Sequence, residues 1–412
     1  MIRKSLAIAV LAAILIVGGR ILAGQPESGK KPLPEMVGAE KALAASGNGF
    51  GFDLFARVVQ ETSPDSNMLI SPLSAMYALS MAYNGAWGQT MTEMARTLRI
   101  PDMPEPVLNE SFLDLATFLT RSDSSVSLDL ANSIWYRRGL PVKPDFVSTM
   151  KEDYGATVRG LDFGPGTVDT INAWVADKTN GHIKQILASP VDASLVMFLA
   201  NAVYFDAAWT RPFDPAATHP IDFHLPDGSI KTCRMMTTRD TLGYLDTGDF
   251  QAVEMPYGDG RYAMIVMLPR PGVAMNDLIG KLTDKNWRQW MSEFATVDVV
   301  LNMPKFAFAD GHGLNAALKA MGMTEAFGRD ADFSRMAEGG GIWIDSVLQK
   351  CFIVVDEHGT EAGAATIVTM KKSLVREVTL DRPFLFAVRE RTTGAVLFLG
   401  KMVDPVMQEQ NN

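Results

Sequence analysis

The chain has 412 residues, of which 47% are hydrophobic and 21% are charged, and its formal net charge is −9 at pH 7. This composition is ordinary for a globular protein that buries a large core. The acidic balance argues against binding to a phosphate backbone, so no nucleic-acid partner is expected.

The amino terminus has the pattern of a secretory leader. A basic start precedes an apolar run from Leu6 to Val17, which predicts a signal peptide over residues 1–24. Apolar residues beyond Arg20 lengthen the run, so an uncleaved membrane anchor is the alternative. Residues 25–45 are rich in proline and lysine and predict a flexible tether. We therefore expect an exported protein, extracellular or periplasmic, either free or held by the anchor.

The rest of the chain predicts one domain over residues 46–412, because no linker, repeat or long charge run divides it. Its first clear helix signal is at Ser71, which can cap a helix whose first turn contains Pro72. Small residues follow at helical spacing and allow close approach to a sheet; they are Ser74, Ala75, Ala78 and Ala82.

The stretch Met197–Trp209 predicts a strand buried on both faces, because both of its alternating faces are apolar. Asn201 lies inside this strand and must find hydrogen-bond partners there. Further on, apolar runs flank glycines 258 and 260 and predict a hairpin over Val253–Pro269.

The segment Asp356–Arg376 reads DEHGTEAGAATIVTMKKSLVR. From Thr360 to Thr369, small and β-forming residues alternate without a proline, which is the pattern of a strand. The segment is also rich in alanine and glycine and ends in basic residues, which suits an exposed loop that a protease can reach. The sequence therefore predicts a segment that can adopt both states.

Motifs for catalysis are absent: the chain has no G-x-S-x-G, H-E-x-x-H, C-x-x-C or phosphate-loop sequence. The five histidines are dispersed, and the nearest pair, His219 and His224, suits a surface strand better than a metal site. No enzymatic activity, metal or cofactor is expected. Cys233 and Cys351 have core-like neighbours and are expected to be free and buried, with a disulfide as the alternative in an exported chain.

The motif GTEAGAAT resembles the hinge of the reactive loop in serpins, the serine protease inhibitor family, and the resemblance covers residues 46–405. It implies an α+β serpin fold with about three β-sheets, eight or nine helices and an exposed reactive-centre loop. Stretches that resemble family helices are Asn48–Phe55, Ile171–Leu187 and Leu314–Phe327. Stretches that resemble family strands or hairpins are Leu130–Gly139, Val299–Phe308, Trp343–Val355 and Phe384–Pro405.

The resemblance also implies a mechanism and a set of site residues. The protein is expected to be a monomeric suicide inhibitor: the cleaved loop inserts into the main sheet and traps the protease as a covalent acyl-enzyme. The implied hinge residues are Glu357, Gly359, Thr360, Glu361, Ala362, Gly363, Ala364, Ala365 and Thr366. The resemblance places Ser71, Ser74 and Asn201 in the shutter beneath the main sheet, and Trp209 in the breach at its top. A serpin-fold protein that binds or chaperones without inhibiting is the alternative.

Two departures from the family pattern matter. Gln349 occupies a position that is commonly histidine in the shutter, and an amide does not titrate, so this region is expected to be less sensitive to pH. Basic residues are scarce from Glu105 to Ser127, where some serpins carry a heparin-binding helix, so no heparin-type cofactor is expected.

The reactive bond is predicted between Lys372 and Ser373. Counting forward from the hinge glycine places Ser373 before the bond, whereas counting back from Pro383 places Lys372 there. Lysine offers the cation that a trypsin-like protease recognises, so we favour Lys372. Alternative reactive-bond residues are Met370, Lys371 and Arg376.

Overall fold

The computed structural model describes residue 33 and residues 35–188, 190–359 and 375–407. The chain divides into two units, Met1–Leu33 and Pro34–Asn412, and every helix and strand described below belongs to the second. The predicted leader and the first part of the tether lie outside the described residues. No helix in the described part of the chain is long and apolar enough to cross a bilayer.

The α+β class is confirmed, and the described residues form nine α-helices, within the expected range. They are α1 (Gly38–Glu61), α2 (Pro72–Gly85), α3 (Gly88–Leu98), α4 (Glu105–Arg121), α5 (Pro144–Glu152), α6 (Thr167–Lys178), α7 (Met275–Lys281), α8 (Asp284–Glu293) and α9 (Asn315–Ala320). Two short 3-10 helices are η1 (Pro215–Ala217) and η2 (Glu325–Phe327).

The first helix begins earlier than the sequence predicted. The N–H of Val37 donates to Oε2 of Glu40 (2.9 Å), which satisfies a backbone donor at the start of α1. Leu43 and Ala44 are already fully buried in the core. The prediction of a flexible tether is therefore wrong for residues 38–45, because these apolar side chains pack against the domain.

The larger sheet has nine strands in the order β1-β14-β13-β8-β7-β6-β9-β12, with β5 paired to β6. The strands are β1 (Met68–Ile70), β5 (His219–His224), β6 (Ile230–Asp246), β7 (Phe250–Tyr257), β8 (Tyr262–Pro269), β9 (Ala295–Pro304), β12 (Arg376–Thr379), β13 (Phe384–Glu390) and β14 (Val396–Met402). The two predicted hairpins are confirmed as the antiparallel pairs β7–β8 and β13–β14.

The smaller sheet has five strands in the order β10-β11-β4-β2-β3. They are β10 (Phe306–Gly313), β11 (Ser346–Val355), β4 (Met197–Ala207), β2 (Val126–Arg137) and β3 (Thr157–Leu161). Strand β4 is buried almost throughout, as predicted. Strands β4 and β11 run parallel, with Ser346 opposite Phe198 at one end and Phe352 opposite Tyr204 at the other. We call this line of pairing the β4–β11 seam.

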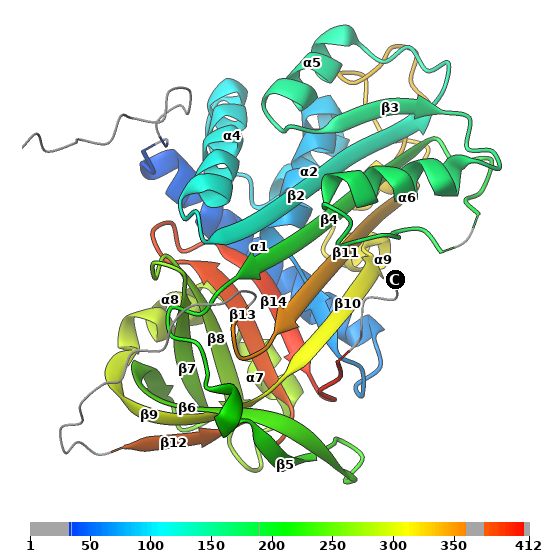
Figure 1. Ribbon diagram of the computed structural model, residues 1–412. Coiled ribbons are helices and arrows are strands. Elements are labelled where there is room, and N and C mark those ends of the chain that lie inside the picture. Colours follow the sequence, from blue (N-terminus) through cyan, green and yellow to red (C-terminus); the bar gives the residue numbers. More distant parts are fainter. Residues whose placement is uncertain (1–32, 34, 189, 360–374, 408–412) are drawn as a thin grey trace, which may run out of the picture. The chain divides into compact units, whose positions relative to one another are not determined.

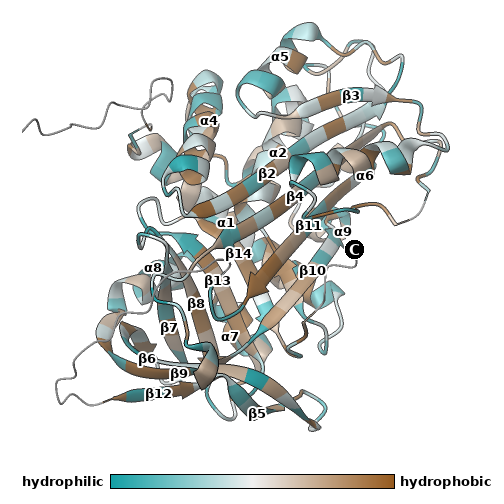
Figure 2. Ribbon diagram, viewed as in Figure 1, coloured by the Kyte–Doolittle hydropathy of each residue, from teal (hydrophilic) through white to brown (hydrophobic). Residues whose placement is uncertain are grey.

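Helices cover both faces of the smaller sheet at the seam. Figure 1 shows α6 crossing the front of the sheet, with α1 and α2 behind it. In front, Ile171 of α6 packs with Trp135 and Phe198 of the sheet. Behind, Ala78 of α2 and Leu199 of β4 are fully buried in the main core. Figure 2 shows the corresponding band of hydrophobic residues along the central strands.

The number of sheets and the bounds of two elements differ from the expectations. The strands form two hydrogen-bonded sheets rather than about three, because the long β6 pairs with β9 and, at its end, with β7. The stretch Val299–Phe308 is divided between β9 and β10 at Lys305, because the N–H of Lys305 bonds to the Arg234 carbonyl (3.0 Å) as the chain passes between the sheets. Helix α9 ends early because Gly322, with φ +100°, stops it in the left-handed region.

Candidate functional site

Most of the predicted reactive loop lies outside the described residues. The residues concerned are Thr360, Glu361, Ala362, Gly363, Ala364, Ala365, Thr366, Met370, Lys371, Lys372 and Ser373. Both ends of the loop are described: β11 leads to Gly359, and the chain resumes just before β12. Arg376 is the first residue of β12, where its backbone pairs with Val299 and its guanidinium carbon lies 5.8 Å from the centre of the Tyr244 ring.

Glu357, the first predicted hinge residue, is anchored in the protein. It is only 5% exposed, the Thr218 hydroxyl donates to its Oε1 (2.8 Å), and the Lys305 ammonium pairs with its Oε2. Burial alone would raise the pKa of Glu357, but the hydrogen bonds from Lys305 and Thr218 outweigh it and hold the pKa below its ordinary value. The charged carboxylate therefore fastens the start of the loop to two other segments.

Gly359 is the last described residue before the loop, and its position requires glycine. Its φ is +84°, which is unfavourable for residues with a side chain. A Cβ at this position would lie 2.4 Å from both the Ala207 carbonyl oxygen and the Trp209 nitrogen. The backbone therefore makes a tight turn after β11, in which the Gly359 N–H donates to the Asp356 carbonyl (3.3 Å), and it packs closely against the end of β4.

Trp209 joins the end of β4 to the start of the loop. Its backbone N–H donates to the His358 carbonyl (3.1 Å), and its indole N–H donates to the Asp356 carbonyl (2.9 Å). Its ring stacks on Tyr257, with the ring centres 4.1 Å apart and the planes at 12°. We call this group the breach cluster: Trp209, Thr218, Tyr257, Lys305, Glu357 and Gly359.

A second polar group lies along the seam, and it connects β11 to the start of α2. Gln349 accepts from the N–H of Ser71 at Oε1 (2.9 Å) and donates from Nε2 to the Ser71 carbonyl (2.9 Å). Ser71 is the residue before α2, but its side chain makes no capping hydrogen bond, so the predicted side-chain cap is wrong. The amide of Gln349 instead satisfies the Ser71 N–H, and Pro72 begins the helix.

Asn201 has the hydrogen-bond partners that the sequence argument required. Its Nδ2 donates to the Ser74 hydroxyl and to Oδ1 of Asn132 (2.7 Å), while its Oδ1 accepts from Nε2 of Gln349 (2.8 Å). All of these groups are buried. We call this group the shutter network: Ser71, Ser74, Asn132, Asn201 and Gln349.

The two groups occupy different places on one seam. Asn201 and Gln349 are register partners in the middle of the β4–β11 pair. The pairing ends at Tyr204 and Phe352; β4 runs on to Ala207, and Trp209 of the breach cluster lies two residues after it. The structure therefore brings together the predicted Ser71, Ser74, Asn201 and Gln349 in one group, and Trp209, Glu357 and Gly359 in the other.

Four members of these groups were not identified from the sequence, and one of them, Tyr257, contributes the ring that stacks on Trp209. Asn132 had a recognisable signal, since it is a polar residue in the apolar strand β2, opposite Asn201. Thr218 and Lys305 had no local signal, because they contact Glu357 from 139 and 52 residues away in the chain.

Within the described residues, one group of acidic and histidine side chains has the spacing of metal ligands, and two cysteines are present. Asp356, Glu357 and His358 could place one ligand atom each within 4.8 Å of one another, but both oxygens of Glu357 already bind Thr218 and Lys305. Cys233 and Cys351 are free and buried, as expected, and burial raises the pKa of both thiols.

Comparisons with known proteins agree with this arrangement. Residues 45–405 match the family model described as "Serpin (serine protease inhibitor)". The leukocyte elastase inhibitor of Xenopus laevis is 31% identical over 377 residues, which cover 88% of this chain and 99% of that protein. The thermophilic serpin Tengpin in its native state has a TM-score of 0.80 at 32% identity, with 91% of this chain and 97% of Tengpin covered. Human thyroxine-binding globulin in complex with its ligand has a TM-score of 0.83 at 28% identity, with 90% and 100% covered.

Proposed function

The chain belongs to the serpin family, and we propose that it inhibits a serine protease by cleavage and insertion of the loop that follows Gly359. The observation that carries the proposal is the β4–β11 seam. A parallel pair is slightly less stable per residue than an antiparallel one. The turn at Gly359 starts from the end of β11, so a loop that folds back beside β11 runs antiparallel to both strands. Its insertion would replace one parallel pair by two antiparallel pairs.

The composition of the loop permits this insertion. The residues that would point into the sheet are Thr360, Ala362, Ala364 and Thr366, and none is bulky, charged or a proline. Loop insertion is a known behaviour of serpins. What this chain adds is an anchored hinge, because Glu357 and Gly359 hold the starting point of the inserting strand at the end of β4.

The proposed reaction begins as ordinary proteolysis. The protease serine attacks the carbonyl of Lys372, an ester forms between them, and the amine of Ser373 leaves with the carboxy-terminal fragment. Insertion from Thr360 to Lys372 would move the attached protease by roughly 40 Å, at about 3.3 Å per residue. Such a displacement distorts the protease before water hydrolyses the ester, so the protein is a trap and not a catalyst.

The expected target is a trypsin-like protease. Lys372 offers a cation to a specificity pocket with a carboxylate. Among the alternatives, Met370 would suit a chymotrypsin- or elastase-like enzyme, and Lys371 would also suit a trypsin-like one. Arg376 is the weakest candidate, because its backbone already pairs with β9 in the sheet.

One experiment tests the mechanism and the bond together. Incubation with trypsin should give a complex that survives denaturing electrophoresis, and mass spectrometry should find a released peptide that begins at Ser373. A peptide that begins at Lys371 or Glu377 would contradict the assigned bond but leave the mechanism standing. Complete cleavage without any complex would contradict the inhibitor proposal.

A hinge variant separates trapping from cleavage. Thr360→Arg would place an unpaired charge in the sheet as insertion starts, which slows insertion and lets the protease deacylate first. The stoichiometry of inhibition should rise several-fold or more, while Thr360→Ser, the matched control, should behave like the wild type. An unchanged stoichiometry in Thr360→Arg would argue against insertion at this hinge.

The second candidate function is ligand binding without inhibition. It is favoured by the likeness to thyroxine-binding globulin, a serpin-fold structure solved with a bound small molecule. The two functions differ in one measurement: cleavage of the loop should raise the melting temperature sharply if the loop inserts. Equal melting curves for cleaved and intact protein would favour the binding function.

We also propose export, directed by residues 1–24. The supporting observation is the basic and apolar pattern at the amino terminus. Amino-terminal sequencing of protein recovered outside the cytoplasm distinguishes a cleaved leader from a retained membrane anchor.

A further inference from the structure

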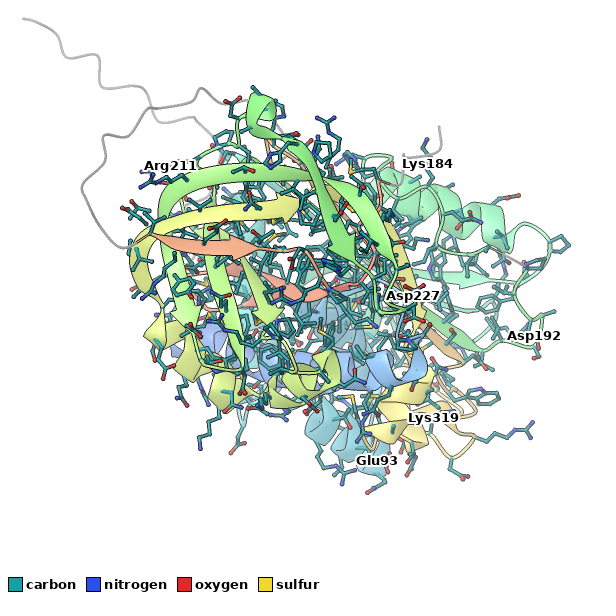
Figure 3. The ribbon with its side chains drawn as sticks, turned by 90° about the horizontal axis from the view of Figure 1, so that it is seen from below. Glu93, Lys184, Asp192, Arg211, Asp227 and Lys319 are labelled. Atoms are coloured by element: carbon teal, nitrogen blue, oxygen red, sulfur yellow. The ribbon has the colours of Figure 1, made fainter. Side chains whose placement is uncertain are left out.

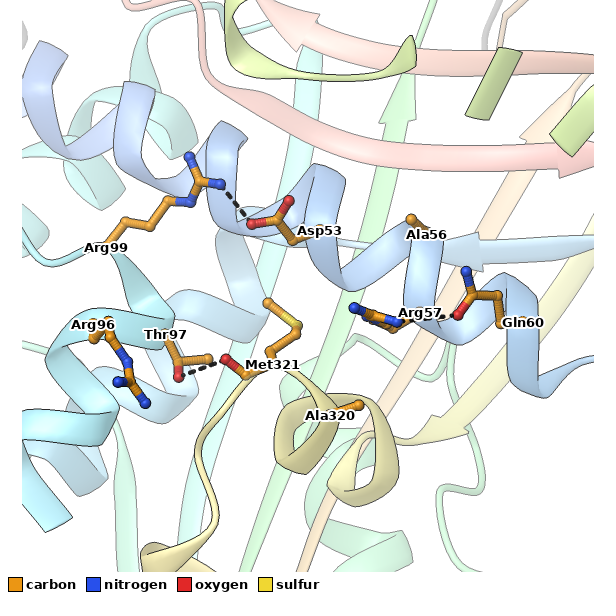
Figure 4. A pocket seen from close by; sticks show the side chains of 9 residues that line it. All are labelled: Asp53, Ala56, Arg57, Gln60, Arg96, Thr97, Arg99, Ala320 and Met321. Carbon is orange, nitrogen blue, oxygen red and sulfur yellow. Dashed lines mark hydrogen bonds and ion pairs between the residues drawn. The ribbon is translucent and has the colours of Figure 1, made fainter. Parts of the chain in front are cut away.

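A hollow lined by arginines lies between α1, α3 and the end of α9 (Figure 4). Its volume is about 520 Å³, which is within the usual range for sites that bind small molecules. We call it the arginine pocket, and the residues of its lining that matter here are Asp53, Ala56, Arg57, Arg96, Arg99 and Met321.

The charge of the pocket is opposite to that of the whole protein. Three guanidinium groups line it, from Arg57, Arg96 and Arg99, and Asp53 is the one carboxylate among the lining residues. The protein as a whole carries a formal charge of −9. A local excess of guanidinium groups in an acidic protein attracts an anion of matching size.

Two of the three arginines have protein partners, and each occupies space that a side chain at a nearby glycine would fill. Arg99 pairs with Asp53 (2.6 Å), and its guanidinium lies where a Cβ on Gly49 would be only 2.7 Å away. Arg96 donates to the Gly322 carbonyl (3.2 Å) and lies where a Cβ on Gly322 would be 2.9 Å away. Both side chains are therefore positioned before any ligand binds, which lowers the entropy lost on binding.

The walls of the pocket are also fixed to each other. On α3, Oε2 of Glu93 accepts from the N–H of Thr324 (2.8 Å) and the N–H of Glu325 (2.8 Å), in the segment that follows α9. Burial alone would raise the pKa of Glu93, but these backbone hydrogen bonds lower it to about 2. Figure 3 shows Glu93 and Lys319 of α9 on the same side of the domain.

Arg57 is the arginine best placed to meet a ligand. Its only hydrogen bond among those found in the described residues is to Oε1 of Gln60 (3.3 Å), one turn along the same exposed face of α1. Ala56 and Met321 supply apolar surface next to it. The pocket therefore combines charged donors with a surface for a nonpolar group.

We propose that the arginine pocket binds a small phosphate monoester, whose phosphate is held by Arg57 and Arg96 and whose organic part contacts Ala56 and Met321. Guanidinium groups suit this ligand because their paired N–H donors match two oxygens of a phosphate. This site is independent of the proposed inhibition, whose residues lie on the seam and the loop.

Calorimetric titration of the full chain with phenyl phosphate and with inorganic phosphate tests the proposal. Both should bind at low salt, and phenyl phosphate should bind more tightly because its ring contacts the apolar surface. Arg57→Gln and Arg96→Gln should each weaken both ligands by about tenfold, the loss of one charge-assisted contact. Met321→Ala should weaken phenyl phosphate only.

The control is Arg138→Gln, which removes an arginine that is 65% exposed, directly follows β2 and is not part of the pocket lining, and it should leave both affinities unchanged. Melting curves without ligand check that each variant is folded. Absence of binding to the wild type overturns the proposal, and so does equal binding by all four variants. Binding of heparin without binding of either phosphate overturns the assignment to a small ligand.

Discussion

The shutter network and the breach cluster close the same seam by different chemistry. In the shutter network, neutral amides and hydroxyls are completely buried and satisfy one another, with Asn201 and Gln349 directly opposite in the register. In the breach cluster, an ion pair between Lys305 and Glu357 and a stacked pair of rings hold the start of the loop. The difference implies that the middle of the seam responds to packing and hydrogen bonding, while its end also responds to pH.

The largest effect is expected from Asn201→Ala in the shutter network. The substitution removes three side-chain contacts and leaves Ser74, Asn132 and Gln349 with buried groups that have lost a partner. We expect the free energy of unfolding to fall by roughly 3 kcal/mol, measured by chemical denaturation. Asn276→Ala, an exposed amide on α7, is the matched control and should change little. A loss as small as that of the control would mean that the network does not stabilise the native seam.

Gly359→Ala should give the next largest effect, at the other end of the seam. Its φ of +84° and the 2.4 Å contacts of a Cβ with Ala207 and Trp209 force the backbone away from β4. The displaced His358 carbonyl would then lose the hydrogen bond from the Trp209 N–H. We expect a loss of about 2 kcal/mol and a changed tryptophan emission.

Gly139→Ala is the control for this variant. Gly139 also has a positive φ, of +91°, but nothing lies within 4 Å of its Cβ position. It should reproduce the backbone strain without the clash and without the change in emission. Equal effects of the two substitutions would show that strain alone, and not contact with β4, explains the result.

Glu357→Gln should have a smaller effect at neutral pH and should change the dependence of stability on pH. The pKa of Glu357 is lowered in the folded protein, so the charged form contributes stability above its ordinary pKa of about 4.5, and this contribution is lost as the pH falls through the folded value. The variant should be less stable by about 1 kcal/mol at pH 7, and the difference between the two proteins should shrink as the pH falls below 4.5. Thermal melts from pH 7 to 3 test this, and a constant difference would refute it.

The smallest effect on stability at neutral pH is expected from Gln349→His. This variant places a titratable group in the shutter network, which otherwise consists of neutral groups. A buried imidazolium lacks the acceptor that the Ser71 N–H needs, so protonation should destabilise the folded state. Stability of the variant should fall as the pH decreases from about 7 to 5, whereas the wild type should stay nearly flat in this range. If the stability of both proteins were independent of pH in this range, the imidazole would not be part of the shutter network.

Local sequence patterns predicted much of the fold for a simple physical reason. The hairpin over Val253–Pro269, the doubly buried strand β4 and the Pro72 start of α2 depend on neighbours a few residues apart, and all three were predicted. The tether boundary at residue 45 was wrong because the start of α1 depends on packing of Leu43 and Ala44 against the rest of the domain. Burial against residues that are distant in the chain cannot be predicted from the few residues on either side of Leu43 and Ala44.

The sequence by itself determined which residue types stand at the site: a proline-free stretch rich in small residues after Gly359, an amide at Asn201 within an apolar strand, and an amide rather than a histidine at Gln349. Only the tertiary structure decided what these residues bind. Ser71 looked like a helix cap and is instead held through its backbone by Gln349, 278 residues away. Glu357 was predicted in the hinge of an exposed loop and is buried against Lys305 and Thr218. Hydrogen bonds and ion pairs need partners at contact distance, and for these residues only the folded chain brings the partners together.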